Sequence, residues 1–216
     1  MERDNWFRRT TWTAADRAGF YARLKRSRPA NRAQYLRIQA WHLQDTGVPE
    51  SLRAALELLD EVLAEYPNDF QLAQVYIQQA ECWLGLGQVE RALDSYRKAM
   101  QRERDFPNVK VGACVGFGWT VIELELTDLY EEVAAVVEAS GRPGDCLFPI
   151  GRYQFSAILA LIEEERGNYE KARHHAEIAL EAARQQHSGL RYHPTLGLVG
   201  DTSTKTHARL EKLVRT

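Results

Sequence analysis

Acidic and histidine side chains near the C-terminal third are spaced as metal ligands could be. Glu170, His174 and Glu177 lie four and three residues apart, so one face of a helix would carry all three. A metal site needs further ligands, and the nearby histidines that could supply them are His175, His187 and His193. Glutamate and histidine are equally ordinary on a solvated helix face. We therefore expect no metal and no cofactor, and we keep a metal-assisted enzyme using Glu170, His174 and a third ligand as an alternative.

Glycine and cysteine residues could indicate a phosphate-binding loop or a nucleophilic enzyme, but the neighbouring residues do not support either. Residues 112–118 are glycine-rich, but no Gly-Lys-Ser/Thr follows them, so a phosphate-binding loop is not expected. Gly112 and Gly116 stand at helical spacing and are predicted to let two helices cross closely. The cysteines have no histidine beside them in sequence, and they are Cys82, Cys114 and Cys146. We therefore predict no catalytic residues and no enzyme.

The cysteines and the general composition indicate the compartment and the class of protein. Three widely separated cysteines fit a reducing cytoplasm without a disulfide framework. In 216 residues, 44% are hydrophobic and 27% are charged, which is typical of a globular protein. No run of 18 apolar residues exists, and the first residues lack the apolar core of a signal peptide. The sequence predicts a cytoplasmic protein that does not span a membrane.

Charge is distributed unevenly along the chain. Residues 1–37 contain ten Lys/Arg and three Asp/Glu, whereas the remaining residues carry an excess of acidic groups. A basic arm can contact nucleic acid, which keeps a regulatory nucleic-acid binder as an alternative. An isoelectric point near 6.3 lacks the basic character usual in such binders. We expect the arm to dock on its own acidic body or to be solvated.

Small residues recur along the chain with a period of 40. Three sets show this spacing: Gly47, Gly87, Thr127 and Gly167; Ala40, Ala80, Thr120 and Ala160; Ala99, Ala139 and Ala179. A period between 20 and 50 residues indicates a repeat architecture. The segments between these markers have apolar residues at helical spacing, and no alternating strand pattern is present. Paired helices are predicted, with first helices at residues 32–45, 70–86 and 151–166, so the fold class is all-α.

The second of these pairs resembles a tetratricopeptide repeat. Residues 80–99 have a small residue, glycine, alanine, aromatic and alanine at that family's distances, and residues 160–179 are similar. Residues 40–62 resemble a third copy, and residues 108–140 a degenerate one. The resemblance implies a right-handed superhelix of about four hairpins over residues 32–187. We expect one domain over residues 1–216, in which a basic segment at 1–31 and a loop and helix at 188–216 cap the two ends.

If the family pattern carries over, the first helices line a concave groove that binds a peptide or a partner protein. Glutamine recurs on this wall, six residues before three of the matched alanines. The residues placed in the groove by the pattern are Gln34, Arg37, Trp41, Gln74, Ile77, Gln78, Glu81, Phe117, Gln154, Leu161 and Glu164. The family's lysine and asparagine clamp for a terminal carboxylate is missing. The chain is therefore predicted to be a non-catalytic interaction module or scaffold, and a homodimer is left open.

The two ends have their own signals. Thr13 and Asp16 form a capping-box pattern that predicts a helix to about Arg28. Trp6 and Trp12 precede it, and they would either cover the first hairpin or stack on bases. Residues 188–201 contain three glycines and a proline, and we expect them to pack on the last repeat or to enter the groove. A short helix is predicted at 205–214.

Overall fold

The computed structural model describes residues 5–215, and within that range the chain is all-helical with no strand. The α-helices are α1 (Ala14–Arg26), α2 (Arg32–Gln44), α3 (Pro49–Glu65), α4 (Leu72–Gly85), α5 (Val89–Asp105), α6 (Ala113–Glu123), α7 (Tyr130–Ser140), α8 (Pro149–Glu165), α9 (Tyr169–Ala183) and α10 (Lys205–Arg215). The predicted fold class is thus confirmed at the level of secondary structure. No helix in the described range is both long enough and apolar enough to cross a bilayer.

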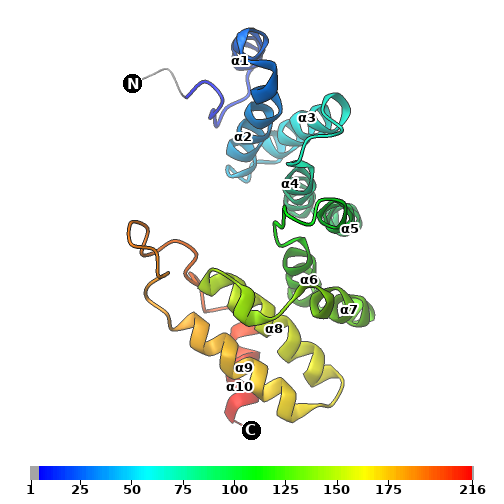
Figure 1. The fold of residues 1–216 in the computed structure, drawn as a ribbon, viewed down its shortest axis with the longest axis vertical. Coiled ribbons are helices and arrows are strands. Elements are labelled where there is room, and N and C mark those ends of the chain that lie inside the picture. Colours follow the sequence, from blue (N-terminus) through cyan, green and yellow to red (C-terminus); the bar gives the residue numbers. More distant parts are fainter. Residues whose placement is uncertain (1–4, 216) are drawn as a thin grey trace. The chain divides into compact units, whose positions relative to one another are not determined.

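The chain divides into two compact units, Met1–Ala113 and Cys114–Thr216. In the first unit, α2 packs against α3 and α4 packs against α5, and α3 joins the two pairs by packing against α4 (Figure 1). Gly47 and Gly87 connect the helices of these pairs with positive φ values of 65° and 71°. Both positions need the left-handed conformation that glycine adopts without strain. The expectation of one repeat domain over the whole chain stays a prediction.

The matched small residues lie where a close contact between helices requires them, with one exception. Ala40, Ala80 and Ala160 have no exposed surface, and Thr120 is 6% exposed. Of the later set, Ala99 and Ala179 are buried, and Ala139 is exposed. Ala139 therefore differs from its counterparts, because the degenerate copy does not bury the helix face on which it lies.

The N-terminal helix has the predicted cap. The Thr13 hydroxyl accepts from the Asp16 backbone N–H, and the Asp16 carboxylate accepts from the Thr13 N–H at 3.0 Å. Helix α1 ends at Arg26, two residues before the predicted end, and Pro29 begins a short 3₁₀ turn. The rings of Trp6 and Trp12 each contact the ring of Phe20, with 5.3 Å between ring centroids. Trp6 also packs on Tyr35 of α2 at 5.0 Å between centroids, so Trp6 covers the first hairpin, whereas the ring contact of Trp12 is with α1.

In the second unit, α8 and α9 form the hairpin predicted around Gly167, and α10 packs on both (Figure 1). The degenerate copy is built differently from its neighbours. Its left-handed residue is Glu125, with φ of 53°, and Thr127 instead begins a 3₁₀ turn. Glu125 is the sole non-glycine residue of the described range with a positive φ. An αL residue with a side chain is strained, so this turn is the least ideal of the four.

The predicted role of the glycine-rich run needs correction. Gly112 precedes α6 with φ of 78°, so it is not part of a helix crossing. Gly118 is the residue that permits close packing. A Cβ atom there would lie 2.9 Å from Val133 of α7 and 3.0 Å from Ile158 of α8.

The loop at 188–201 packs on the last hairpin, as predicted. The Ile150 backbone N–H donates to the Gly197 carbonyl at 2.8 Å. A Cβ atom on Gly197 would lie 2.6 Å from Phe148, so the loop backbone sits directly against that ring. The loop is therefore fixed at the start of α8.

Candidate functional site

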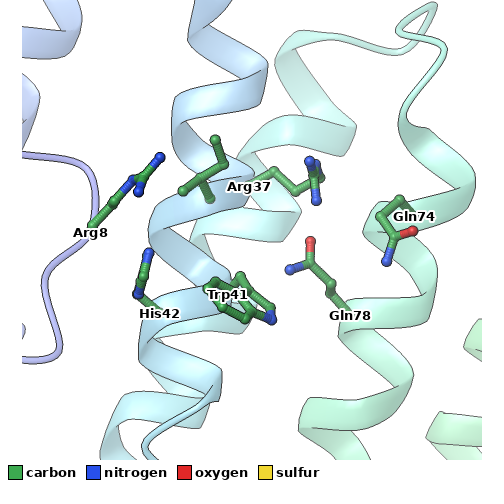
Figure 2. Close-up of a pocket in the computed structure, with 7 residues that line it drawn as sticks. Arg8, Arg37, Trp41, His42, Gln74 and Gln78 are labelled. Carbon is green, nitrogen blue, oxygen red and sulfur yellow. The ribbon is translucent and has the colours of Figure 1, made fainter. Parts of the chain in front are cut away.

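A pocket of about 370 Å³ lies over α2 and α4 in the first unit (Figure 2). The residues that line it are Arg8 from the N-terminal arm, Arg37, Ile38, Trp41 and His42 from α2, and Gln74 and Gln78 from α4. Four of the residues that the repeat pattern placed in a groove are thereby brought together: Arg37, Trp41, Gln74 and Gln78.

Helix periodicity explains why these side chains share one wall. Arg37 and Trp41 are four residues apart on α2, and Ile38 and His42 repeat that spacing one position later. The opposite side of α2 is buried, with Leu36 and Leu43 fully enclosed in the core. The apolar stripe therefore turns the polar and aromatic stripe outward. On α4, Gln74 and Gln78 are also one turn apart.

Gln78 is the most unusual residue of the pocket. Its side chain extends from α4 toward α2, between Arg37 and Trp41 (Figure 2). It is 1% exposed, yet neither its Nε2 nor its Oε1 has a hydrogen-bond partner within residues 5–215. A buried polar group left unpaired costs about 1–3 kcal/mol. The amide therefore has a donor and an acceptor that a bound group could use.

Two other buried glutamines of the same unit show what a structural glutamine looks like. Gln39 is fully buried, and its amide donates to the Arg9 carbonyl at 2.7 Å and accepts from the Arg9 N–H at 3.0 Å. Gln79 is 7% exposed and donates to Asp60 at 2.6 Å. Gln78 differs from both because its donor and its acceptor are unused.

Arg37 is held in place by two hydrogen bonds in series. The Arg37 Nε donates to the Gln71 side-chain oxygen at 3.0 Å, and the Gln71 backbone N–H donates to Asp69 at 2.7 Å. Burial lowers the pKa of Arg37, an effect that the nearby Asp69 opposes, and an arginine remains protonated at neutral pH. These two hydrogen bonds leave the outer nitrogens of Arg37 available to a ligand.

His42 and Trp41 form an aromatic pair beside Arg8. Their rings lie 4.7 Å apart in an edge-to-face arrangement, and Trp41 is 45% exposed. Burial lowers the pKa of His42, and the positive charge of Arg8 lowers it further. His42 is therefore mainly neutral at pH 7. An anion bound nearby would favour its protonation.

The remaining groove predictions in the first unit fall outside this pocket. Gln34 is exposed, Ile77 is buried at 8% exposure, and Glu81 accepts from Gln44 of α2 at 2.5 Å. These three residues do not line it.

In the second unit the groove assignment is largely wrong. Phe117 and Leu161 have no exposed surface, so neither presents a side chain to a ligand. Glu164 is paired with Arg209 of α10, and Gln154 is half-buried. The cause lies partly in α10, which packs on α8 and covers a face that an uncapped hairpin would expose.

The residues considered for other chemistry show no arranged site. Among residues 5–215, no three His, Cys, Asp or Glu side chains are grouped to hold a metal, and Glu170, His174 and Glu177 are exposed. Cys82 is fully buried, and burial raises the pKa of its thiol to about 12. A thiol with that pKa is not a nucleophile at neutral pH.

Arg8, Ile38 and His42 were not predicted from the sequence. Ile38 and His42 follow Arg37 and Trp41 by one position, so a wider reading of the same stripe would have included them. Nothing in the local sequence predicts that Arg8 reaches the pocket, because it precedes Arg37 by about 30 residues in the chain. Searches of protein-family models, of curated proteins and of solved structures found no match to this chain.

Proposed function

We propose that the chain is a non-catalytic interaction module. Its helical hairpins stack as a tetratricopeptide-like right-handed superhelix, and the pocket over α2 and α4 binds an extended segment of a protein partner. The observation that carries this proposal is Gln78, whose buried amide has an unused donor and an unused acceptor beside the pocket.

A peptide backbone offers the complementary pair of groups. Each residue of an extended chain has one N–H and one C=O, and a glutamine side chain can bond to both kinds. Gln74 and Gln78 are separated by one helical turn, a rise of about 6 Å. Residues on one side of an extended chain repeat every 6.6 Å or so. The two amides are thus spaced to meet the backbone groups of alternate residues of one bound strand.

The rest of the pocket suits binding better than catalysis. Trp41 and Ile38 provide an apolar surface between the polar groups, and exposed aromatic residues of this kind anchor partners. The pocket has no carboxylate or cysteine among its lining residues, and its one titratable base is His42. A lone histidine without a nucleophile or an acid partner does not form a catalytic set.

Binding to an array of random ten-residue peptides, blocked at both termini, tests this proposal. The wild-type chain should retain a reproducible subset of peptides. Gln78→Met and Trp41→Ala should lose at least ten times in apparent affinity for that subset, because each removes a group that the pocket presents. The helical circular dichroism of both variants should match the wild type.

Arg53→Gln is the matched control, since Arg53 is exposed on α3 and does not line the pocket. It should bind the same subset as the wild type. Full binding by both pocket variants, together with loss of binding in a variant outside the pocket, would show that the pocket is not the site.

One observation favours a second candidate function. Arg8 belongs to the basic arm and lines the same pocket as the exposed Trp41, and arginines and aromatic rings occur together in single-strand nucleic-acid sites. Affinity for single-stranded RNA or DNA that falls steeply with salt would support it. Absence of binding at low salt would remove it.

A further inference from the structure

The pocket is cationic on both sides of its aromatic centre. Arg8 supplies the positive charge on one side of α2, beside the neutral His42, and Arg37 supplies it on the other side, facing α4 (Figure 2). No Asp or Glu is among the lining residues, and the nearby Asp69 is already bonded to the Gln71 backbone. Within residues 5–215, neither Arg8 nor Arg37 forms an ion pair with a carboxylate.

The position of Arg8 beside the pocket is fixed by the contacts of the residues before and after it in the chain. The residue after it, Arg9, is clamped by both hydrogen bonds of the buried Gln39 amide. The residue before it, Phe7, is buried and packs on Tyr35 at 4.7 Å between ring centroids. With both neighbours fixed on α2, the Arg8 guanidinium is confined to the region of the pocket. The arm is therefore a built part of the site rather than a solvated tail.

Charge and hydrogen-bonding capacity together define the chemistry of the occupant. The Gln78 amide needs a ligand with a donor and an acceptor close together, which a peptide group supplies. Two arginines without carboxylate partners can bind an anion, and carboxylates match the guanidinium fork. Because the arginines flank Trp41 from opposite sides, they can pair with acidic groups at two points of one strand.

We infer that the pocket, if it binds peptides as proposed above, selects segments with internal acidic side chains. Asp or Glu residues of the segment pair with Arg37 on one side of Trp41 and with Arg8 on the other, while Gln78 bonds to the backbone between them. Gln39 acts as a positioning residue, because it fixes the arm that carries Arg8.

Positional-scanning octapeptide pools test this inference. The peptides are acetylated and amidated, so that only side chains carry charge, and one central position is fixed as Glu, Asp, Gln, Asn, Leu or Lys in separate pools. The wild type should retain the Glu and Asp pools about tenfold better than the Gln and Asn pools, the range expected for a charge-assisted hydrogen bond. The preference should weaken as salt is raised from 50 to 500 mM.

The variants separate charge recognition from backbone recognition. Arg37→Gln and Arg8→Gln should each reduce the acidic preference, whereas Arg53→Gln, the matched loss of one positive charge, should keep it. Gln39→Met should reproduce the effect of Arg8→Gln, and adding Arg8→Gln to it should cause no further loss. A preference equally strong in Arg37→Gln and Arg8→Gln would overturn the assignment of these arginines.

Failure of this inference is distinguishable from failure of the proposed function. Retention of peptides in a Gln78-dependent way without acidic preference would overturn the acidic selection and leave the peptide site standing. Retention of no pool would overturn both. Displacement of bound Glu pools by uridine 5′-monophosphate at lower concentration than by a Glu peptide would overturn the peptide class in favour of a nucleotide.

Discussion

At the scale of single residues, three buried glutamines of one unit separate structure from function. Gln39 and Gln79 use their amides within the fold, and Gln78 does not. Repetition alone could not have made this distinction, because all three are ordinary polar residues on helices. Burial combined with an unused donor and acceptor is what singles out Gln78.

Gln78→Met should raise the stability of the free protein while it removes peptide binding. Methionine has nearly the same length and needs no hydrogen bond, so the penalty of the unpaired amide disappears. We expect the free energy of unfolding to rise by about 1 kcal/mol in urea denaturation. Gln79→Met is the matched control and should lower it, since Asp60 loses its donor. A destabilised Gln78→Met would mean that the amide has a partner inside the fold.

Asp16 gives a pH-dependent prediction for the arm. Its carboxylate accepts from the Thr13 hydroxyl, the Thr13 backbone and the Thr11 hydroxyl and pairs with Arg9, which lowers its pKa from 3.8 to about 2. A lowered pKa means that this stabilisation is complete above about pH 4 and disappears as the pH falls toward 2. Asp16→Asn should therefore have a lower Tm at pH 7, with the difference shrinking at pH 2. An unchanged difference across that range would contradict the assignment.

At the scale of helices, the repeat pattern predicted where each pair turns but not how the degenerate pair packs. Gly47, Gly87 and Gly167 end first helices as predicted, because a left-handed residue is a local requirement that sequence reveals. Phe117 and Leu161 were misplaced because burial of a helix face depends on which distant element covers it. The capping helix α10 is such an element, joined to α8 by the Tyr153–His207 and Glu164–Arg209 contacts.

Gly118→Ala tests the close packing of α6. The added methyl group would approach Val133 at 2.9 Å and Ile158 at 3.0 Å, so overpacking should cost about 1–3 kcal/mol. Gly19→Ala on α1 is the control, because the nearest atom is the flexible end of Arg9 at 3.9 Å. There the better helix propensity of alanine should stabilise the chain by up to about 1 kcal/mol. Equal effects of the two changes, read from urea denaturation, would refute the packing role of Gly118.

At the scale of the whole molecule, the fold was more predictable than the site. The all-α class and the approximate bounds of α2, α4 and α8 follow from the 40-residue period and the apolar stripes. The pocket depends in addition on Arg8, which reaches it because a glutamine on α2 binds the backbone of the arm. Such a long-range hydrogen bond leaves no periodic trace in sequence. The composition shows that the N-terminal segment is basic, but it does not show that this segment packs on α2.

The most direct test follows the Gln78 side-chain amide itself by ¹⁵N–¹H correlation spectroscopy during titration with the Glu-fixed octapeptide pool. We expect a large shift of the Gln78 Nε2 resonance and slower exchange of its protons with water, while the Gln79 resonances stay in place. Saturation of the chain with peptide while the Gln78 resonances remain unmoved would contradict the central claim that this amide binds the partner's backbone.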